Sequence, residues 1–274
     1  QDRHNQMLES SKEQVEKADT RDRESRAFLH ALLAGNRDLA KTLLHSLHEG
    51  MYNSRKYRFC RMICLSDATG SMSGIWQSTR ESIHKMLDQI DDIGEGNFEL
   101  MWLAYRDYCD GPDLVENSPW SKEPSELTAF VSRIECKGGG DYPEAVEIAL
   151  QQANKEHEKD PITCVLLIGD APPHFENKGE ALTSHGGRIM TTDYQTEAKK
   201  LKENGVPVFT FRLNNSMDLV SSFDTIASIT EGTSHYLDFS AEGTKKLVDC
   251  VCETAIHGIG GSELVAEYRK KYGN

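Results

Sequence analysis

The stretch RFCRMICLSDATGSMSG, residues 58–74, joins a largely apolar run to a turn rich in side-chain oxygen. Its first ten residues have the pattern of a strand that is buried in a sheet. A helical pattern begins directly afterwards and runs from Ile75 to Ile93, with its apolar side chains on one face. A strand that leads directly into a helix is the repeating unit of a parallel α/β sheet.

The same alternation continues along the rest of the chain. Further strand patterns occur at 98–108, 162–171, 206–214 and 233–239, with an edge element expected at 114–120. Further helical patterns occur at 123–134, 143–157, 193–205, a segment that ends at 229, and 242–256. The predicted fold class is therefore α/β, a doubly wound, mostly parallel, Rossmann-like sheet flanked by helices.

The pattern divides the chain into three parts. Residues 1–54 are charged and helical in pattern, residues 55–260 contain the alternating strands and helices, and residues 261–274 form a helical tail. We predict that the N-terminal extension is a helical hairpin packed on the main domain. A partner-binding or dimerising coil is the alternative, although no heptad pattern persists over three or more repeats.

Composition excludes two function classes. The formal net charge of −13 argues against nucleic acid, which selects a basic face. None of the apolar runs approaches the roughly 18 residues that a membrane helix needs, so no membrane span is predicted. A hydrophobic fraction of 38% in 274 residues is enough to fill the core of a globular domain.

The cysteines indicate a reducing compartment. Cys60, Cys64 and Cys164 lie inside apolar, strand-like runs, where small buried thiols are common, so the predicted localisation is cytoplasmic. The first ten residues are polar and lack the apolar region of a signal peptide. Because the chain starts with Gln1 and not Met, whether it is a fragment of a longer protein is left open.

Three acidic loops are expected to meet at one edge of the sheet. Asp67 and Asp170 each end a predicted strand, and ligands of open parallel sheets bind at the carboxyl ends of the strands. Asp141 lies in the glycine loop KGGGDYPEA, before a helix that Pro143 is expected to start. Asp141 is therefore either a third ligand or the N-cap of that helix.

The alternation of Asp67, Thr69 and Ser71 allows one extended turn to aim three oxygen-bearing side chains at one point. Mg²⁺ prefers oxygen ligands and keeps several waters, which suits hydroxyls and carboxylates that act through water. The turn therefore predicts a site for a divalent cation, Mg²⁺ with Mn²⁺ and Ca²⁺ as alternatives.

These residues resemble the von Willebrand factor type A (VWA) domains. The metal-ion-dependent adhesion site (MIDAS) of that family has Asp-x-Ser-x-Ser on a first loop, Thr on a second and Asp on a third. Asp67, Thr69 and Ser71 match the first loop, and Asp170 matches the third. The resemblance implies that Thr69 and Ser71 coordinate the metal directly, that Asp67 and Asp170 act mainly through water, and that a partner's carboxylate completes the shell.

Four motifs, DATGSM, YRDY, GGGDYPE and DAPPH, resemble the intracellular VWA domains found beside alpha-type protein kinases, although nothing in the chain resembles the kinase itself. The second loop departs from the adhesive pattern, because Gly140 or Asp141 stands where those members have Thr. We favour Asp141, and a third carboxylate there would weaken the attraction of the metal for an acidic ligand.

Other polar and aromatic residues are weaker candidates. Asp107 is predicted to support the site with a hydrogen bond, to form a surface pair with Arg106 or to belong to a turn at the end of the strand. His174 and His185 follow Asp170 in a long loop, where they either cap the site or, as the favoured interpretation, are solvated. Among the tryptophans, Trp76 and Trp102 are expected in the core. Trp120 is a candidate anchor for a protein partner if its side chain is exposed.

The predicted function is a non-catalytic protein-binding module that coordinates one divalent cation at a MIDAS-type site. The alternative is a Mg²⁺-dependent phosphotransferase or phosphatase like the haloacid dehalogenases, with Asp67 as nucleophile. Ala68 and His174 depart from the motifs of that class. The partner's identity and the oligomeric state are left open.

Overall fold

The computed structural model describes residues 59–94, 96–140, 142–174, 192–237 and 241–273. The chain divides into two units, residues 1–58 and residues 59–274. The expected helical extension, residues 1–54, lies outside the described residues, and everything that follows concerns the second unit.

The strands of this unit form a six-stranded sheet in the order β3-β2-β1-β4-β5-β6. β3 is antiparallel to β2, and every other pair of neighbours is parallel. The strands are β1 (Cys60–Asp67), β2 (Phe98–Tyr105), β3 (Val115–Asn117), β4 (Cys164–Gly169), β5 (Val208–Arg212) and β6 (Ser234–Tyr236). The predicted doubly wound, mostly parallel sheet and its short edge element are confirmed.

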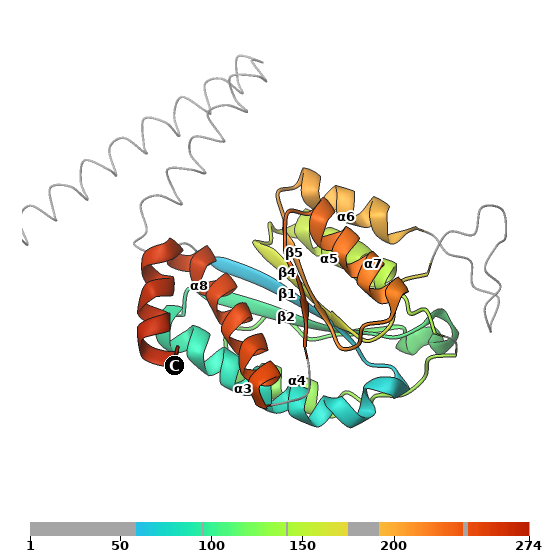
Figure 1. The fold of residues 1–274 in the computed structure, drawn as a ribbon, viewed down its shortest axis with the longest axis horizontal. Helices are drawn as coiled ribbons and strands as arrows, with labels where there is room; N and C mark the ends of the chain where they lie inside the picture. Colours follow the sequence, from blue (N-terminus) through green and yellow to red (C-terminus); the bar gives the residue numbers. More distant parts are fainter. Residues whose placement is uncertain (1–58, 95, 141, 175–191, 238–240, 274) are drawn as a thin grey trace, which may run out of the picture. The chain divides into compact units, whose positions relative to one another are not determined.

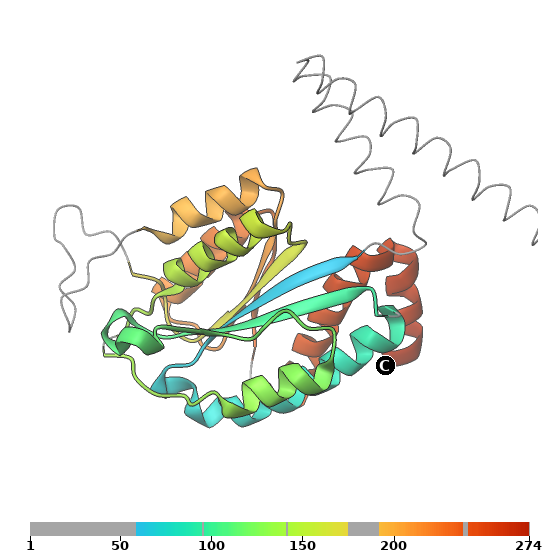
Figure 2. The ribbon, with the colours of Figure 1, turned by 180° about the vertical axis from the view of Figure 1, so that it is seen from behind.

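Helices cover both faces of the sheet. α5, α6 and α7 lie on one face, and α3, α4 and α8 lie on the other (Figure 1); Figure 2 shows the same layers from behind. The helices are α3 (Ser73–Gly94), α4 (Pro124–Arg133), α5 (Val146–Lys159), α6 (Tyr194–Glu203), α7 (Met217–Ile229) and α8 (Ala241–Tyr272). Within the described residues, no helix is both long and apolar enough to cross a membrane.

The central strands are buried on both faces, which is why their sequences are largely apolar. Every residue of β4 is buried, and β1 is buried except at Arg61. In register, Leu65 lies between Leu103 of β2 and Leu167 of β4. All three belong to one apolar cluster with residues of α5, α6 and α7. The core therefore fixes the position at which each strand ends.

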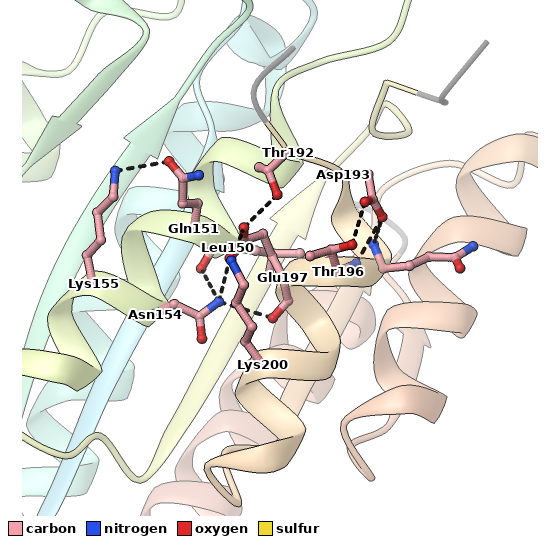
Figure 3. Close-up of polar contacts among 10 residues, drawn as sticks. Leu150, Gln151, Asn154, Lys155, Thr192, Asp193, Thr196, Glu197 and Lys200 are labelled. Atoms are coloured by element: carbon pink, nitrogen blue, oxygen red, sulfur yellow. Dashed lines mark hydrogen bonds and ion pairs between the residues drawn. The ribbon is translucent and has the colours of Figure 1, made fainter. Parts of the chain in front are cut away.

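A buried polar cluster joins α5 to α6 (Figure 3). The Asn154 side-chain amide donates to the backbone oxygen of Glu197 at 3.1 Å and to its Oε2 at 2.8 Å. Thr192 Oγ1 and Lys200 Nζ donate to Glu197 Oε1. Because both Asn154 and Glu197 are buried, these bonds replace water and fix the two helices against each other.

Two helix boundaries differ from the predictions. α5 begins at Val146 with Ala145 as its N-cap, three residues after Pro143. The reason is that the backbone N–H of Glu144 donates to Pro172 O and that of Ala145 donates to Arg106 O, so these residues pair with neighbouring loops. α8 continues beyond the predicted end at residue 256 to Tyr272, with a break at Gly260 and Gly261, where the backbone is not helical.

Candidate metal centre at the carboxyl edge of the sheet

The carboxyl ends of β1 and β4 hold the two acidic residues that the sequence analysis placed there. Asp67 is the last residue of β1, and Asp170 directly follows β4. A pocket of about 420 Å³ opens at this edge. It is lined by Thr69, Gly70, Ser71, Gly138, Gly139, Gly140, Tyr142, Glu144, Asp170, Ala171 and Asn214. The first and third predicted loops therefore converge on one cavity.

The turn after β1 holds its own oxygen atoms in place. Asp67 Oδ1 accepts hydrogen bonds from the backbone N–H of Thr69 at 2.8 Å and from Thr69 Oγ1 at 2.7 Å. Thr69 Oγ1 and Ser71 Oγ are 3.2 Å apart. Asp67 and Thr69 are buried, whereas Ser71 is exposed at the pocket. One carboxylate and two hydroxyls are thus gathered by contacts that span only five residues.

Asp67 and Asp170 each have a buried carboxylate oxygen that accepts no hydrogen bond in the described part of the chain. Neither Asp67 Oδ2 nor Asp170 Oδ1 has a partner among the described residues. The loop of Asp170 is held through its backbone, because the side-chain amide of Asn214 donates to Asp170 O. Buried polar atoms are nearly always satisfied, so two orphaned carboxylate oxygens beside two hydroxyls fit a bound cation.

Electrostatics at this edge also favour a cation. Burial raises the pKa of Asp67 well above its ordinary value, and the neighbouring charge of Asp170 raises it further. The hydrogen bonds from Thr69 oppose this shift. Two carboxylates held together in a buried position repel each other, and a divalent cation offsets that repulsion.

Glu144 is an acidic residue of the pocket that the sequence analysis missed. It is 4% exposed, and its Oε2 has no hydrogen-bond partner within the described part of the chain. Burial raises the pKa of Glu144 to about 10, with further contributions from the charges of Asp67, Asp107 and Asp110. A signal was present in the sequence, because GGGDYPEA places Glu144 within the glycine loop, three residues after Asp141.

The donor set is one of hydroxyls and a few carboxylates. In the described ranges, no group of three His, Cys, Asp or Glu side chains has an arrangement that could hold a metal ion. The residues that fit are Asp67, Thr69, Ser71 and Asp170, two carboxylates and two hydroxyls. Hydroxyl and carboxylate oxygens suit a hard cation such as Mg²⁺.

Asp141 lies outside the described residues, so its role as a ligand stays a prediction. The alternative that Asp141 caps the following helix is wrong, because α5 begins at Val146 and its N-cap is Ala145. Gly140 lines the pocket. His185 also lies outside the described residues.

His174 and Asp107 are not solvated, which corrects two of the expectations. His174 is 2% exposed, and its Nε2 lies 2.7 Å from Oδ1 of the fully buried Asp107. Asp107 forms no surface pair with Arg106, because Arg106 is itself buried and pairs with Glu116. Both corrections have one cause, a contact between residues 67 positions apart that no local pattern reveals.

The tryptophans follow the core predictions. Trp76 and Trp102 are buried, and the indole N–H of Trp102 donates to Ser66 Oγ. Trp120 is only partly buried, but it is not a free anchor. The guanidinium of Arg61 lies 3.8 Å from its ring centroid, and its indole N–H donates to Glu156.

Comparisons with known proteins support the same architecture. The family model of the von Willebrand factor type A domain matches residues 62–249. A protein of Acanthamoeba polyphaga mimivirus, named as an ariadne-like RING finger protein, is 28% identical over 181 residues. That match covers 64% of this chain but only 18% of the viral protein.

Two solved structures share the fold at low sequence identity. The pilus adhesin SpaC of Lactobacillus rhamnosus GG has a TM-score of 0.55 at 15% identity, over 72% of this chain and 30% of the adhesin. Proximal thread matrix protein 1 from the mussel byssus has a TM-score of 0.54 at 14% identity, over 79% of this chain and 52% of that protein. Identities this low show the fold alone.

Proposed function

This chain belongs to the von Willebrand factor type A domain family, and we propose that it is a non-catalytic protein-binding module that holds one divalent cation at Asp67, Thr69, Ser71 and Asp170. Domains of this family are generally protein-interaction modules. The observation that carries the cation site is the pair of buried carboxylate oxygens, Asp67 Oδ2 and Asp170 Oδ1, that accept no hydrogen bond in the described residues.

Each residue has a role in this proposal. The hydroxyls of Thr69 and Ser71 bind the cation directly, and Asp67 and Asp170 balance its charge and bind through water. Asp67 also orients Thr69, since its Oδ1 accepts two hydrogen bonds from that residue. When bound, a divalent cation supplies a positive charge with free coordination positions for oxygen ligands.

The proposed partner is a protein that presents an acidic side chain to the pocket. The pocket reaches the surface beside Ser71, Gly70 and Gly140, all of which are exposed. Hard cations prefer carboxylate oxygen, which makes an aspartate or glutamate of the partner the chemical match.

We also propose that the protein acts in the cytoplasm. The thiols of Cys60, Cys64 and Cys164 are free and buried, as expected for a protein kept in a reducing compartment.

No observation in the described residues favours the alternative of a phosphotransferase like the haloacid dehalogenases. α3 begins at Ser73, directly after the turn of Asp67, and leaves no room for the loop or cap that such enzymes insert there. The experiment below nevertheless includes a test for turnover.

The test is a calorimetric titration of the metal-stripped full chain with Mg²⁺ and with Mn²⁺. Asp67→Asn and Asp170→Asn should weaken binding at least tenfold, because each removes a charge that faces the cation. The matched control is Asp160→Asn, which removes the same charge from an exposed position before β4, at the opposite edge of the sheet. It should leave the affinity unchanged.

Two results would overturn the proposal. Equal cation affinity in wild type, Asp67→Asn and Asp170→Asn would show that the site is elsewhere or absent. Hydrolysis of p-nitrophenyl phosphate that depends on Mg²⁺ and on Asp67 would assign the chain to the phosphotransferases instead.

A further inference from the structure

Three loops interlock around the pocket by hydrogen bonds between distant parts of the chain. The Lys137 N–H donates to Ala68 O at 3.1 Å, which joins the glycine loop to the turn after β1. The Glu144 N–H donates to Pro172 O at 2.9 Å, which joins the segment before α5 to the loop of Asp170. The loops that carry the candidate cation site are therefore held together by backbone hydrogen bonds from residues outside the site.

Asp107 and His174 form the buried side-chain link in this set. Asp107 follows β2, and His174 lies four residues after Asp170. Their side chains are 0% and 2% exposed and meet at 2.7 Å. Because a carboxylate oxygen can only accept, the hydrogen of this bond is on His174 Nε2. A buried hydrogen bond to a charged group is among the stronger contacts in a fold.

The surroundings hold both partners of this link. Burial by itself would raise the pKa of Asp107, but the hydrogen bond and charge of His174, together with bonds from Tyr108 and Cys109, lower it below its ordinary value. The backbone N–H of His174 donates to Glu147 Oε2 at 3.4 Å. The Tyr108 ring packs edge-on against the imidazole of His174, with 5.2 Å between the ring centroids. Asp107 is thus kept as a charged acceptor in the interior.

The link also reaches the glycine loop. The Asp107 N–H and the Gly139 N–H both donate to Asp110 Oδ2, at 3.0 and 3.1 Å. Gly139 lines the pocket and lies against Thr69, since a Cβ built on it would be 3.4 Å from Thr69 Cβ. Asp107 therefore has His174 on one side and the wall of the pocket on the other.

The loop between Asp170 and His174 is held through its backbone by Asn214 and Glu144, and His174 adds a buried side-chain contact at its end. Two of its three residues are Pro172 and Pro173, which have no N–H to donate. Proline also restricts the backbone of the residue before it, so the segment from Ala171 to Pro173 has few accessible backbone conformations. Fixing His174 thus fixes the direction in which Asp170 enters the pocket.

We propose that the Asp107–His174 pair positions Asp170 and the glycine loop for cation binding, without touching the cation. This inference rests on the proposed function, because it needs the cation site at Asp67, Thr69, Ser71 and Asp170. Side chains that orient metal ligands commonly change metal affinity by 10- to 100-fold when they are replaced.

The test compares two amide replacements of one residue. In His174→Gln, the side-chain amide nitrogen can take the place of Nε2 and donate to Asp107. In His174→Asn, the side chain is too short for its amide nitrogen to reach Asp107. We expect the dissociation constant for Mn²⁺, measured by calorimetry on the full chain, to rise at least tenfold in His174→Asn. In His174→Gln it should stay within threefold of wild type.

The matched control is Asn154→Ala, which removes equally buried hydrogen bonds between α5 and α6. It should lower the urea midpoint of unfolding but leave the Mn²⁺ dissociation constant unchanged, which separates positioning from general stability. Asp107→Ala removes the acceptor of the same hydrogen bond. It is tested in place of His174→Asn if the His174→Asn variant does not fold.

The possible results are distinguishable. If wild type binds neither Mg²⁺ nor Mn²⁺, the proposed function fails and this inference fails with it. If wild type binds but His174→Asn binds equally well, only the positioning role is overturned. Equal losses in His174→Asn and His174→Gln, or a similar loss in Asn154→Ala, would also overturn it.

Discussion

Gly138→Ala should lower the free energy of unfolding more than the same substitution at Gly205, a glycine that also has a positive φ but has open space around it. Gly138 has φ +76°, and a Cβ built there would lie 1.8 Å from Asp110 Oδ1. Gly205, which follows the last turn of α6, has φ +70° and no atom within 4 Å of such a Cβ. The two positions share the backbone cost of alanine at positive φ but differ in the steric clash.

The difference can be estimated from the bonds that Asp110 makes. Alanine in the left-handed region costs about 1–2 kcal/mol, and this should be the whole effect of Gly205→Ala. In Gly138→Ala the carboxyl of Asp110 must also move, which breaks its bonds from the N–H groups of Asp107 and Gly139. At about 1 kcal/mol for each bond, Gly138→Ala should cost about 2 kcal/mol more than Gly205→Ala.

Urea unfolding at 25 °C measures both costs, and Mn²⁺ titration of the same samples shows whether the loss reaches the pocket. Gly138→Ala should also weaken Mn²⁺ binding, because Gly138 lines the pocket, whereas Gly205→Ala should not. If the two variants lost the same stability within about 0.5 kcal/mol, Asp110 would not hold the glycine loop as described.

Three further predictions concern the rest of the domain. Burial raises the pKa of Glu147 from 4.5 to about 7, so the folded state binds a proton that the unfolded chain releases, and stability is lost as pH rises through this window. Glu147→Gln should remove that loss, about 3 kcal/mol between pH 4.5 and 7.5 by urea unfolding. Trp102→Phe should cost about 3 kcal/mol because it leaves a cavity and an orphaned Ser66 hydroxyl, and adding Ser66→Ala in that background should cost almost nothing more by the same assay. Arg269→Gln breaks an exposed ion pair with Glu253 and should cost at most about 1 kcal/mol, less in 1 M NaCl.

The sheet could be predicted because its signals are local. β1 and β4 are buried on both faces, so their apolar runs are visible without any knowledge of the neighbours. The positions of Asp67 and Asp170 follow from this, since each residue ends a run and the carboxyl ends of parallel strands share an edge. The first and third loops of the site were therefore accessible from the sequence.

The second loop was not predictable in the same way. Pro143 predicts a helix start, but the backbone N–H of Glu144 donates to Pro172 O, which is far away in the sequence. For this reason α5 begins only at Val146. The burial of Glu147 was predictable from the sequence, because helical spacing places it on the same face as Leu150, three residues later. An acidic side chain on an apolar face indicates a buried charge.

His174 shows why burial in loops escapes sequence patterns. It follows two prolines and belongs to no helix or strand, so nothing periodic distinguishes it from a solvated histidine. Its burial depends on Asp107, which reaches it only because β2 and β4 both flank β1 in the finished sheet. The contact is a product of topology, and topology is known only after the strands have been ordered.

Most of the buried polar atoms that lack a partner in the described residues gather at one edge of the sheet, which is itself an argument for function. Within the described ranges, Asp67 and Asp170 each leave a buried oxygen without a partner, and Glu144 does the same beside Thr69. Each such atom costs stability, and a fold selected only for stability would replace them by apolar or amide side chains. Sequences violate the rules of burial chiefly where a site requires it. The hydrogen bonds between loops, with the Asp107–His174 link among them, offset part of this cost and hold the three acidic side chains close together, an arrangement that fits a bound cation.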